Sequence, residues 1–88
     1  MQSSLIGKVE KAKRYAQQPE RVRITTMELT FQGEHDAYEV ALTGNQWRCS
    51  CNFFDSFGTC AHVMAMQRMF EVMLTPEART APGMAQAV

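Results

Sequence analysis

Three cysteines and one histidine fall within fourteen residues of the chain, in the pattern C-x-C-x8-C-x-H. These residues are Cys49, Cys51, Cys60 and His62. Thiolate sulfur and imidazole nitrogen are preferred ligands of Zn²⁺, and four of them complete a tetrahedral site. Such a site leaves no coordination position for water, which is typical of a structural zinc ion and not of a hydrolytic one. We therefore predict one structural zinc ion and no enzymatic activity.

Other chemistry stays open at this point. A disulfide between Cys49 and Cys51 would be strained, because both side chains lie on one face of a strand. Cys60 and His62 could act as nucleophile and base, although no orienting third group or oxyanion device accompanies them. Iron–sulfur clusters prefer four cysteines at other spacings, whereas copper(I) and simple buried thiols remain alternatives. His35, in a turn between acidic residues, is an alternative ligand.

Two elements must bring the ligands together. Cys49 and Cys51 share one face of a strand, because strand side chains alternate with a period of two. Cys60 and His62 cannot share a face of a helix body, because a two-residue step rotates by about 200°. We expect Cys60 just before the first turn of a helix and His62 within that turn, where the helix N-terminus favours thiolates.

Hydrophobic periodicity predicts an α+β fold: an N-terminal helix, a three-stranded antiparallel β-meander, a zinc-clamped loop, a C-terminal helix and a flexible tail. The apolar stripes of both helices should cover one face of the sheet. A single domain over residues 1–75 should contain a helix at 3–18, strands at about 21–31, 37–43 and 46–51 with a bulge near Thr25-Thr26 in the first, a loop at 52–59, and a helix at about 61–74, before a flexible tail at 76–88.

The stretches Trp47-Arg48-Cys49-Ser50-Cys51-Asn52-Phe53-Phe54 and Gly58-Thr59-Cys60-Ala61-His62-Val63-Met64-Ala65 resemble the SWIM-type zinc finger. With the preceding Tyr38-x-Val40-x-Leu42 strand and the apolar helix after His62, the resemblance covers roughly residues 20–74. It implies strands followed by a helix around a zinc ion, and binding of DNA or of proteins. Family members often have a proline and an acidic residue after the second cysteine, where this chain has Asn52 and Phe53.

The charge of the chain is balanced overall but divided along the sequence. Nine basic and nine acidic residues give a net charge of zero. Residues 1–23 hold six basic and two acidic residues, whereas residues 24–46 hold four acidic and no basic residues. The basic block could contact phosphates, although neutral charge and a pI near 6.7 are unusual for an autonomous DNA binder. The candidate nucleic-acid contacts are Lys8, Lys11, Arg14, Arg21 and Arg23.

A protein partner is the favoured prediction, with nucleic acid as the alternative. The loop after Cys51 has three phenylalanines, and some of them should stay exposed beside the zinc site as contact residues. The candidate partner contacts are Phe53, Phe54, Phe57, Arg48 and Arg68. We expect no membrane span and no small-molecule substrate. Because the N-terminus has no secretory signal and thiols persist in reducing compartments, we expect a cytoplasmic protein, or a nuclear one in a eukaryote.

Overall fold

The computed structural model describes residues 3–80 and shows a mixed α+β fold with helices at both ends. Three strands, β1 (Thr26–Gln32), β2 (Ala37–Thr43) and β3 (Gln46–Cys49), form an antiparallel meander in the order β1-β2-β3. Strand alternation sets the register: Phe31 lies opposite Tyr38, Leu42 opposite Trp47, and Val40 opposite Cys49. The predicted fold class is confirmed.

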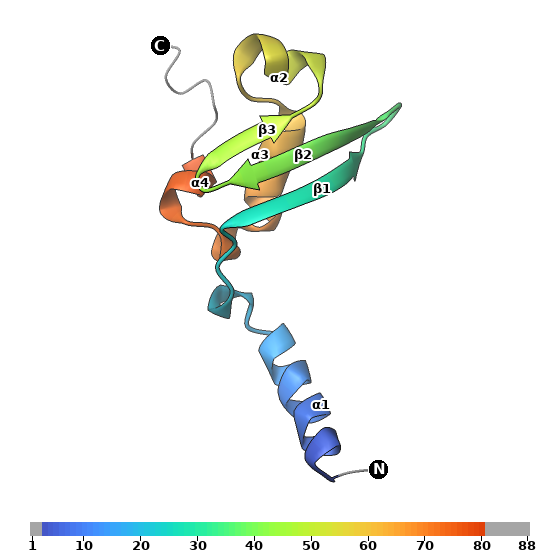
Figure 1. Ribbon diagram of the computed structural model, residues 1–88, viewed down its shortest axis with the longest axis vertical. Coiled ribbons are helices and arrows are strands. Elements are labelled where there is room, and N and C mark those ends of the chain that lie inside the picture. Colours follow the sequence, from blue (N-terminus) through green and yellow to red (C-terminus); the bar gives the residue numbers. More distant parts are fainter. Residues whose placement is uncertain (1–2, 81–88) are drawn as a thin grey trace.

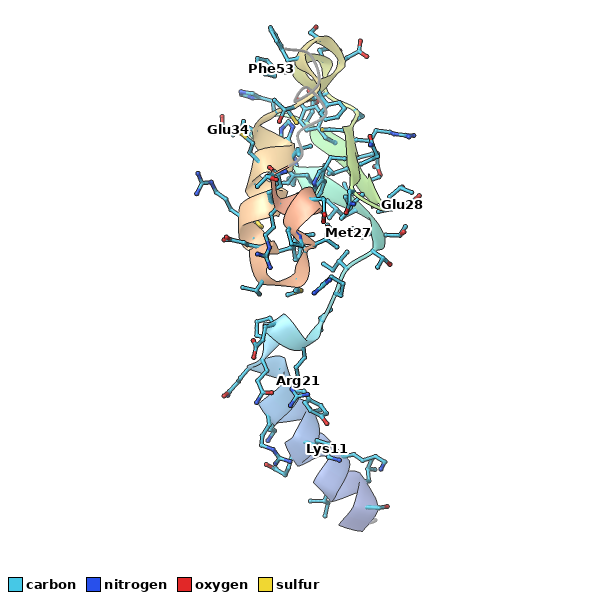
Figure 2. The ribbon with its side chains drawn as sticks, turned by 90° about the vertical axis from the view of Figure 1, so that its left-hand side faces the viewer. Lys11, Arg21, Met27, Glu28, Glu34 and Phe53 are labelled. Atoms are coloured by element: carbon cyan, nitrogen blue, oxygen red, sulfur yellow. The ribbon has the colours of Figure 1, made fainter. Side chains whose placement is uncertain are left out.

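The C-terminal half of the described chain contains α2 (Asn52–Phe57), α3 (Ala61–Met69), the 3-10 helix η2 (Glu71–Met73) and α4 (Pro76–Thr80). Of these, α3 covers one face of the sheet, whereas α2 lies beyond the end of β3 (Figure 1). The core lies between β2, β3, α3 and α4; its buried members include Val40, Leu42, Trp47, Val63, Met66, Leu74 and Ala78. The other sheet face is not covered by any element of residues 3–80 and carries exposed polar residues such as Glu28, which points away from α3 in Figure 2.

The N-terminal helix α1 (Ser3–Ala16) projects away from this core (Figure 1). The prediction that its apolar stripe covers the sheet is wrong, because residues 4–17 are all exposed and the main contact of α1 is with the 3-10 helix η1 (Pro19–Arg21). The molecule measures 55 × 29 × 17 Å, with a radius of gyration of 16.5 Å. A compact chain of this length would have about 12 Å.

Several predicted boundaries differ from the structure. The first helix ends at Ala16 and not at residue 18, before Pro19 opens η1. The first strand begins at Thr26 and not at residue 21, without the bulge, because its partner β2 ends at Thr43 and leaves earlier residues unpaired. The third strand ends at Cys49, because Cys51 turns the chain into α2.

The segment predicted as a loop at 52–59 forms the short helix α2, which Cys51 caps and Gly58 ends with a left-handed backbone (φ 77°). The helix predicted for 61–74 stops at Met69, where Phe70 leaves helical geometry, and η2 follows. The carbonyl of Met73 then accepts a hydrogen bond of 2.7 Å from the backbone N–H of Ile24.

The prediction of a flexible tail from residue 76 is wrong for residues 76–80. Thr75 caps α4 by accepting a hydrogen bond of 3.1 Å from the Ala78 N–H, and Pro76 occupies the first helical position. Ala78 is fully buried, and its carbonyl accepts a 2.8 Å hydrogen bond from Trp47 Nε1. Residues 81–88 of the predicted tail lie outside the described residues. Among the helices of residues 3–80, none is long and apolar enough to span a bilayer.

Candidate metal centre

The four predicted ligands come from three adjoining elements. Cys49 ends β3, Cys51 is the N-cap of α2, Cys60 is the N-cap of α3, and His62 lies in the first turn of α3. One ligand atom from each residue lies within 4.8 Å of every other. The two helix starts therefore supply three ligands, and the strand supplies one.

The distances fit a common tetrahedral ligand set. His62 Nδ1 lies 3.6 Å from Cys49 Sγ and 3.7 Å from Cys60 Sγ. Ligands at about 2.3 Å for sulfur and 2.0–2.1 Å for nitrogen around one tetrahedral Zn²⁺ would be separated by similar distances. The three cysteines are free thiols and do not form a disulfide. The donor set and its spacing fit zinc, and a Cys₃His set of this kind is typical of structural sites.

Backbone N–H groups point at two of the sulfurs. The Phe54 N–H donates to Cys51 Sγ at 3.4 Å, and the Val63 N–H donates to Cys60 Sγ at 3.5 Å. Both bonds follow from the N-cap position, where a side-chain acceptor satisfies a free N–H of the first turn. They stabilise negative charge on the sulfurs, so the capping geometry and the metal favour the same thiolate state.

Without metal, burial opposes ionisation of two thiols. Burial raises the pKa of Cys49, and it raises the pKa of Cys60, which is 1% exposed, to about 12. Burial also acts on Cys51, but hydrogen bonds led by that from the Phe54 N–H outweigh it and lower the Cys51 pKa. Three thiolates in this small volume therefore need a cation to balance them.

His62 is oriented by aromatic residues of the sheet that were not among the predicted site residues. Its ring stacks on Tyr38, with centroids 4.4 Å apart, and lies tilted against Phe31 at 5.0 Å. Phe31 and Tyr38 are directly opposite in the β1–β2 register. The signal that could have found them is the alternation of the two strands, which places both rings on the covered face of the sheet.

The predicted partner residues do not form one surface. Phe53 and Phe57 are exposed on α2, with ring centroids 4.5 Å apart, whereas Phe54 is half-buried against the core. Arg48 lies on the open face of the sheet, and Arg68 lies on α3 beside a groove that α3 forms with α4. His35, the alternative ligand, is exposed in the β1–β2 turn and is not in the ligand cluster.

The predicted nucleic-acid contacts lie far from the metal centre. Lys8, Lys11 and Arg14 are exposed on α1, Arg21 ends η1, and Arg23 follows it. Figure 2 shows Lys11 and Arg21 on α1 and η1, which together form the N-terminal arm, and Phe53 at the opposite end of the molecule. The basic residues of the arm and the exposed Phe53 therefore lie on separate surfaces.

A hollow of about 630 Å³ lies directly beside the ligands. It is lined by the ligands Cys51, Cys60 and His62 and by Tyr38, Phe53 and Met64. Phe53 and the neighbouring Phe57 are called here the apolar rim of the metal centre. Asp36 lines the hollow as well, and no lysine or arginine does. The hollow is thus apolar with a slight acidic character.

Residues 38–66 match the model of the SWIM zinc finger family. The match contains all four ligands, their C-x-C-x8-C-x-H spacing, and the strands and helix starts that position them. This part of the chain therefore has the sequence pattern and the ligand set of a SWIM zinc finger, and its Cys₃His cluster supports one structural Zn²⁺. Neither the search of curated proteins nor that of solved structures found a match for the chain.

Proposed function

We propose that the chain is a zinc-stabilised protein-interaction module whose contact surface is the apolar rim of the metal centre. The observation that carries this proposal is the exposed pair Phe53 and Phe57, because two large rings in contact with each other and with water are costly unless a partner covers them. Phe53 is 55% exposed and borders the hollow beside the ligands. An apolar side chain of a partner would fit there as an anchor.

The proposed role of the zinc ion is structural. It holds the starts of α2 and α3 against the end of β3, and so fixes the position of the phenylalanine pair. The proposal includes no catalysis, because four protein ligands leave the metal without an open position. It also includes an intracellular setting, cytoplasmic or nuclear, in which the thiols stay reduced.

DNA binding is the second candidate function, favoured by one separate observation. Five predicted phosphate contacts are exposed on or next to α1, and only one ion pair, from Lys13 to Glu10, engages the basic residues of α1 among the described side chains. Phosphate binding there would not involve the metal centre. The absence of basic residues from the wall of the hollow favours the protein-interaction proposal for the zinc finger itself.

The test compares the zinc-loaded chain with two variants. Phe53→Ser/Phe57→Ser removes the apolar rim, and Lys11→Gln/Arg14→Gln removes charge from the arm. Partners are captured from cells that express the protein, and each captured protein is then purified and tested for direct binding. The first variant should lose the partner, and the second should keep it. In a fluorescence-anisotropy titration with DNA, salt-sensitive binding that only the second variant loses would favour the alternative.

A further inference from the structure

The arm helix α1 has an apolar stripe that nothing covers within residues 3–80. Leu5, Val9, Ala12 and Ala16 follow one another at steps of four, three and four residues, and so share one face of the helix. Leu5 and Val9 are each 47% exposed. A helix of 14 residues without a packed face is marginal in water, and Gly7 in its first half costs about 1 kcal/mol relative to alanine. This helix therefore gains stability only from a partner.

The sizes of the stripe residues make it complementary to itself in one orientation. Large side chains occupy its N-terminal half and alanines its C-terminal half. An antiparallel pair places Leu5 against Ala16 of a second copy, and Val9 against Ala12 of that copy. Each layer of the interface then has nearly the same thickness, which close packing requires. A parallel pair would stack leucine on leucine at one end and leave a gap between alanines at the other.

The charges beside the stripe select the same orientation. Lys8 and Lys13 flank it, and both are exposed. In a parallel pair, the flanking positions place Lys8 of one helix against Lys13 of the other, which repels. In an antiparallel pair, Lys8 faces Tyr15 of the second copy and Lys13 faces Ile6. A tyrosine ring attracts cations, as the Arg21 guanidinium 5.0 Å from the Tyr15 centroid illustrates within one chain.

The remaining charges of the helix do not oppose the pairing strongly. Lys11 and Arg14 lie on the side of α1 opposite the stripe, so in a pair they point outward on opposite flanks. Across two helix diameters of about 10 Å each, they are separated by more than the Debye length of about 8 Å at physiological salt. Their repulsion is therefore largely screened.

We propose that α1 is a dimerisation helix through which two copies of this chain pair in antiparallel orientation. The shape of the molecule permits this pairing, because α1 projects from the core and an antiparallel pair sends the two cores to opposite ends (Figure 1). A helix of this length spans about 21 Å. The pair buries less than the roughly 1,200 Å² of a standard stable interface, so the dimer is weak and forms in the micromolar range or above.

The test is sedimentation velocity on the zinc-loaded chain over a hundredfold range of concentration, at low and high salt. We expect a monomer–dimer equilibrium whose affinity is unchanged or rises with salt, because salt screens repulsion between basic helices. Val9→Gln should abolish the dimer, whereas the matched outward-facing change Lys11→Gln should keep it. Gly7→Ala should tighten it about fivefold for each helix, because a Cβ at Gly7 meets nothing within 4 Å.

Orientation is tested by mixing Ile6→Cys and Lys13→Cys chains with zinc bound, under oxidised glutathione. The antiparallel pair predicts a mixed disulfide between the two variants and little of either homodimeric product. A chain that stays monomeric at every concentration, also as Gly7→Ala, would overturn the proposal. Dimers that survive Val9→Gln, or that give no mixed disulfide, would also overturn it. Dimers that dissociate when salt is added would overturn it too, because salt sensitivity points to a contaminating acidic partner or nucleic acid.

Discussion

His62 reaches the metal centre from the side of the sheet, with its ring against Tyr38 and Phe31. The two rings limit how the imidazole can turn, and its Nδ1 stays within 3.7 Å of two sulfurs. Residues that fix the orientation of a ligand matter for metal affinity nearly as much as the ligand does.

Replacement of Tyr38 by alanine should therefore weaken zinc binding while all four ligands remain. We expect a loss of affinity of about 10–100-fold, measured by competition with a chromophoric chelator. Tyr15→Ala, an equal truncation on the exposed arm, serves as the control and should bind zinc normally. Equal affinities for both variants would mean that the metal alone orients the imidazole.

Acid should release the zinc ion because protons compete for the thiols. Without metal, burial raises the pKa of Cys49 and that of Cys60, so both are protonated at neutral pH and binding must displace their protons. Zinc affinity should then fall as pH falls, on the order of tenfold per pH unit for each proton displaced. Equilibrium dialysis against a metal buffer between neutral and mildly acidic pH measures this slope, and a flat profile would contradict it.

The stability of the metal-free chain should instead fall as pH rises. Cys60 has a folded pKa of about 12 against an ordinary 9.0, so the folded state holds its proton more tightly than the unfolded state. Its contribution to stability is complete below pH 9 and is lost as pH rises from 9.0 toward 12. Chemical denaturation of the metal-free chain across that alkaline range measures this loss as a fall in the free energy of unfolding.

The ligands could be predicted from the sequence because all four are close neighbours in the chain and form two closely spaced pairs, although Cys51 caps α2 and does not continue the strand of Cys49 as predicted. Phe31 and Tyr38 could not be assigned to the site in the same way. They reach His62 only after the β1–β2 register and the placement of α3 on the sheet are fixed. Both depend on tertiary packing.

At the scale of elements, α4 closes the core. Its Ala78 is 0% exposed, and two side chains, Trp47 and Gln67, donate hydrogen bonds to the Ala78 carbonyl. The Thr75 hydroxyl caps the helix and also lies 2.6 Å from Asn45 Oδ1 in the β2–β3 turn. A five-residue helix is thereby joined to the sheet at two places.

Enlarging Ala78 should therefore destabilise the fold. In a fully buried position, Ala78→Leu should lower the free energy of unfolding by about 1–3 kcal/mol through overpacking. Denaturant titration of the zinc-saturated protein measures it, with the exposed neighbouring change Glu77→Ala as control. A stability equal to that of the control would mean that residues 76–80 do not pack as described.

Elements with a clear period could be predicted, and short ones could not. Alternation over seven residues gave the bounds of β2 correctly, and the helical stripe gave the start of α3. The six residues of α2 and five of α4 are too few to show a period. Their only signals were caps: Cys51 and Thr75 before them, Pro76 at the first position and Gly58 after α2. The exposed position of α1 could not be predicted from its apolar stripe, because an amphipathic pattern does not indicate which element covers the helix.

At the scale of the whole molecule, the metal centre forms one end of the core, because its three cysteines belong to the same buried cluster as the residues between the sheet and α4. The ligands hold the end of β3 and the starts of α2 and α3, whereas Leu42, Trp47, Met66, Leu74 and Ala78 form the core toward α4. Zinc therefore clamps one end of the layered structure. The other end has apolar packing of its own.

Chelation should consequently loosen residues 46–65 first and leave the β1–β2 hairpin and the α3–α4 contact partly ordered. Hydrogen exchange measured with and without a chelator should show protection lost near Cys51 and Cys60 before it is lost at Leu42 and Met66. The helix α1 should exchange equally with and without the chelator, because it does not contact the metal centre. Uniform loss of protection across residues 26–80 would show instead that metal binding and folding are one transition.

The length of the molecule has a consequence for avidity. In the antiparallel pair proposed for α1, each copy would carry its hollow toward the end of a 55 Å body that lies opposite its arm. A partner with one binding motif would gain nothing from such a pair. A partner with two motifs on a linker long enough to span both ends would bind the second one at a raised effective concentration, and a linker too short would lose that gain entirely. The length of the paired arms would thus determine which partners bind both copies at once, according to the spacing of their motifs.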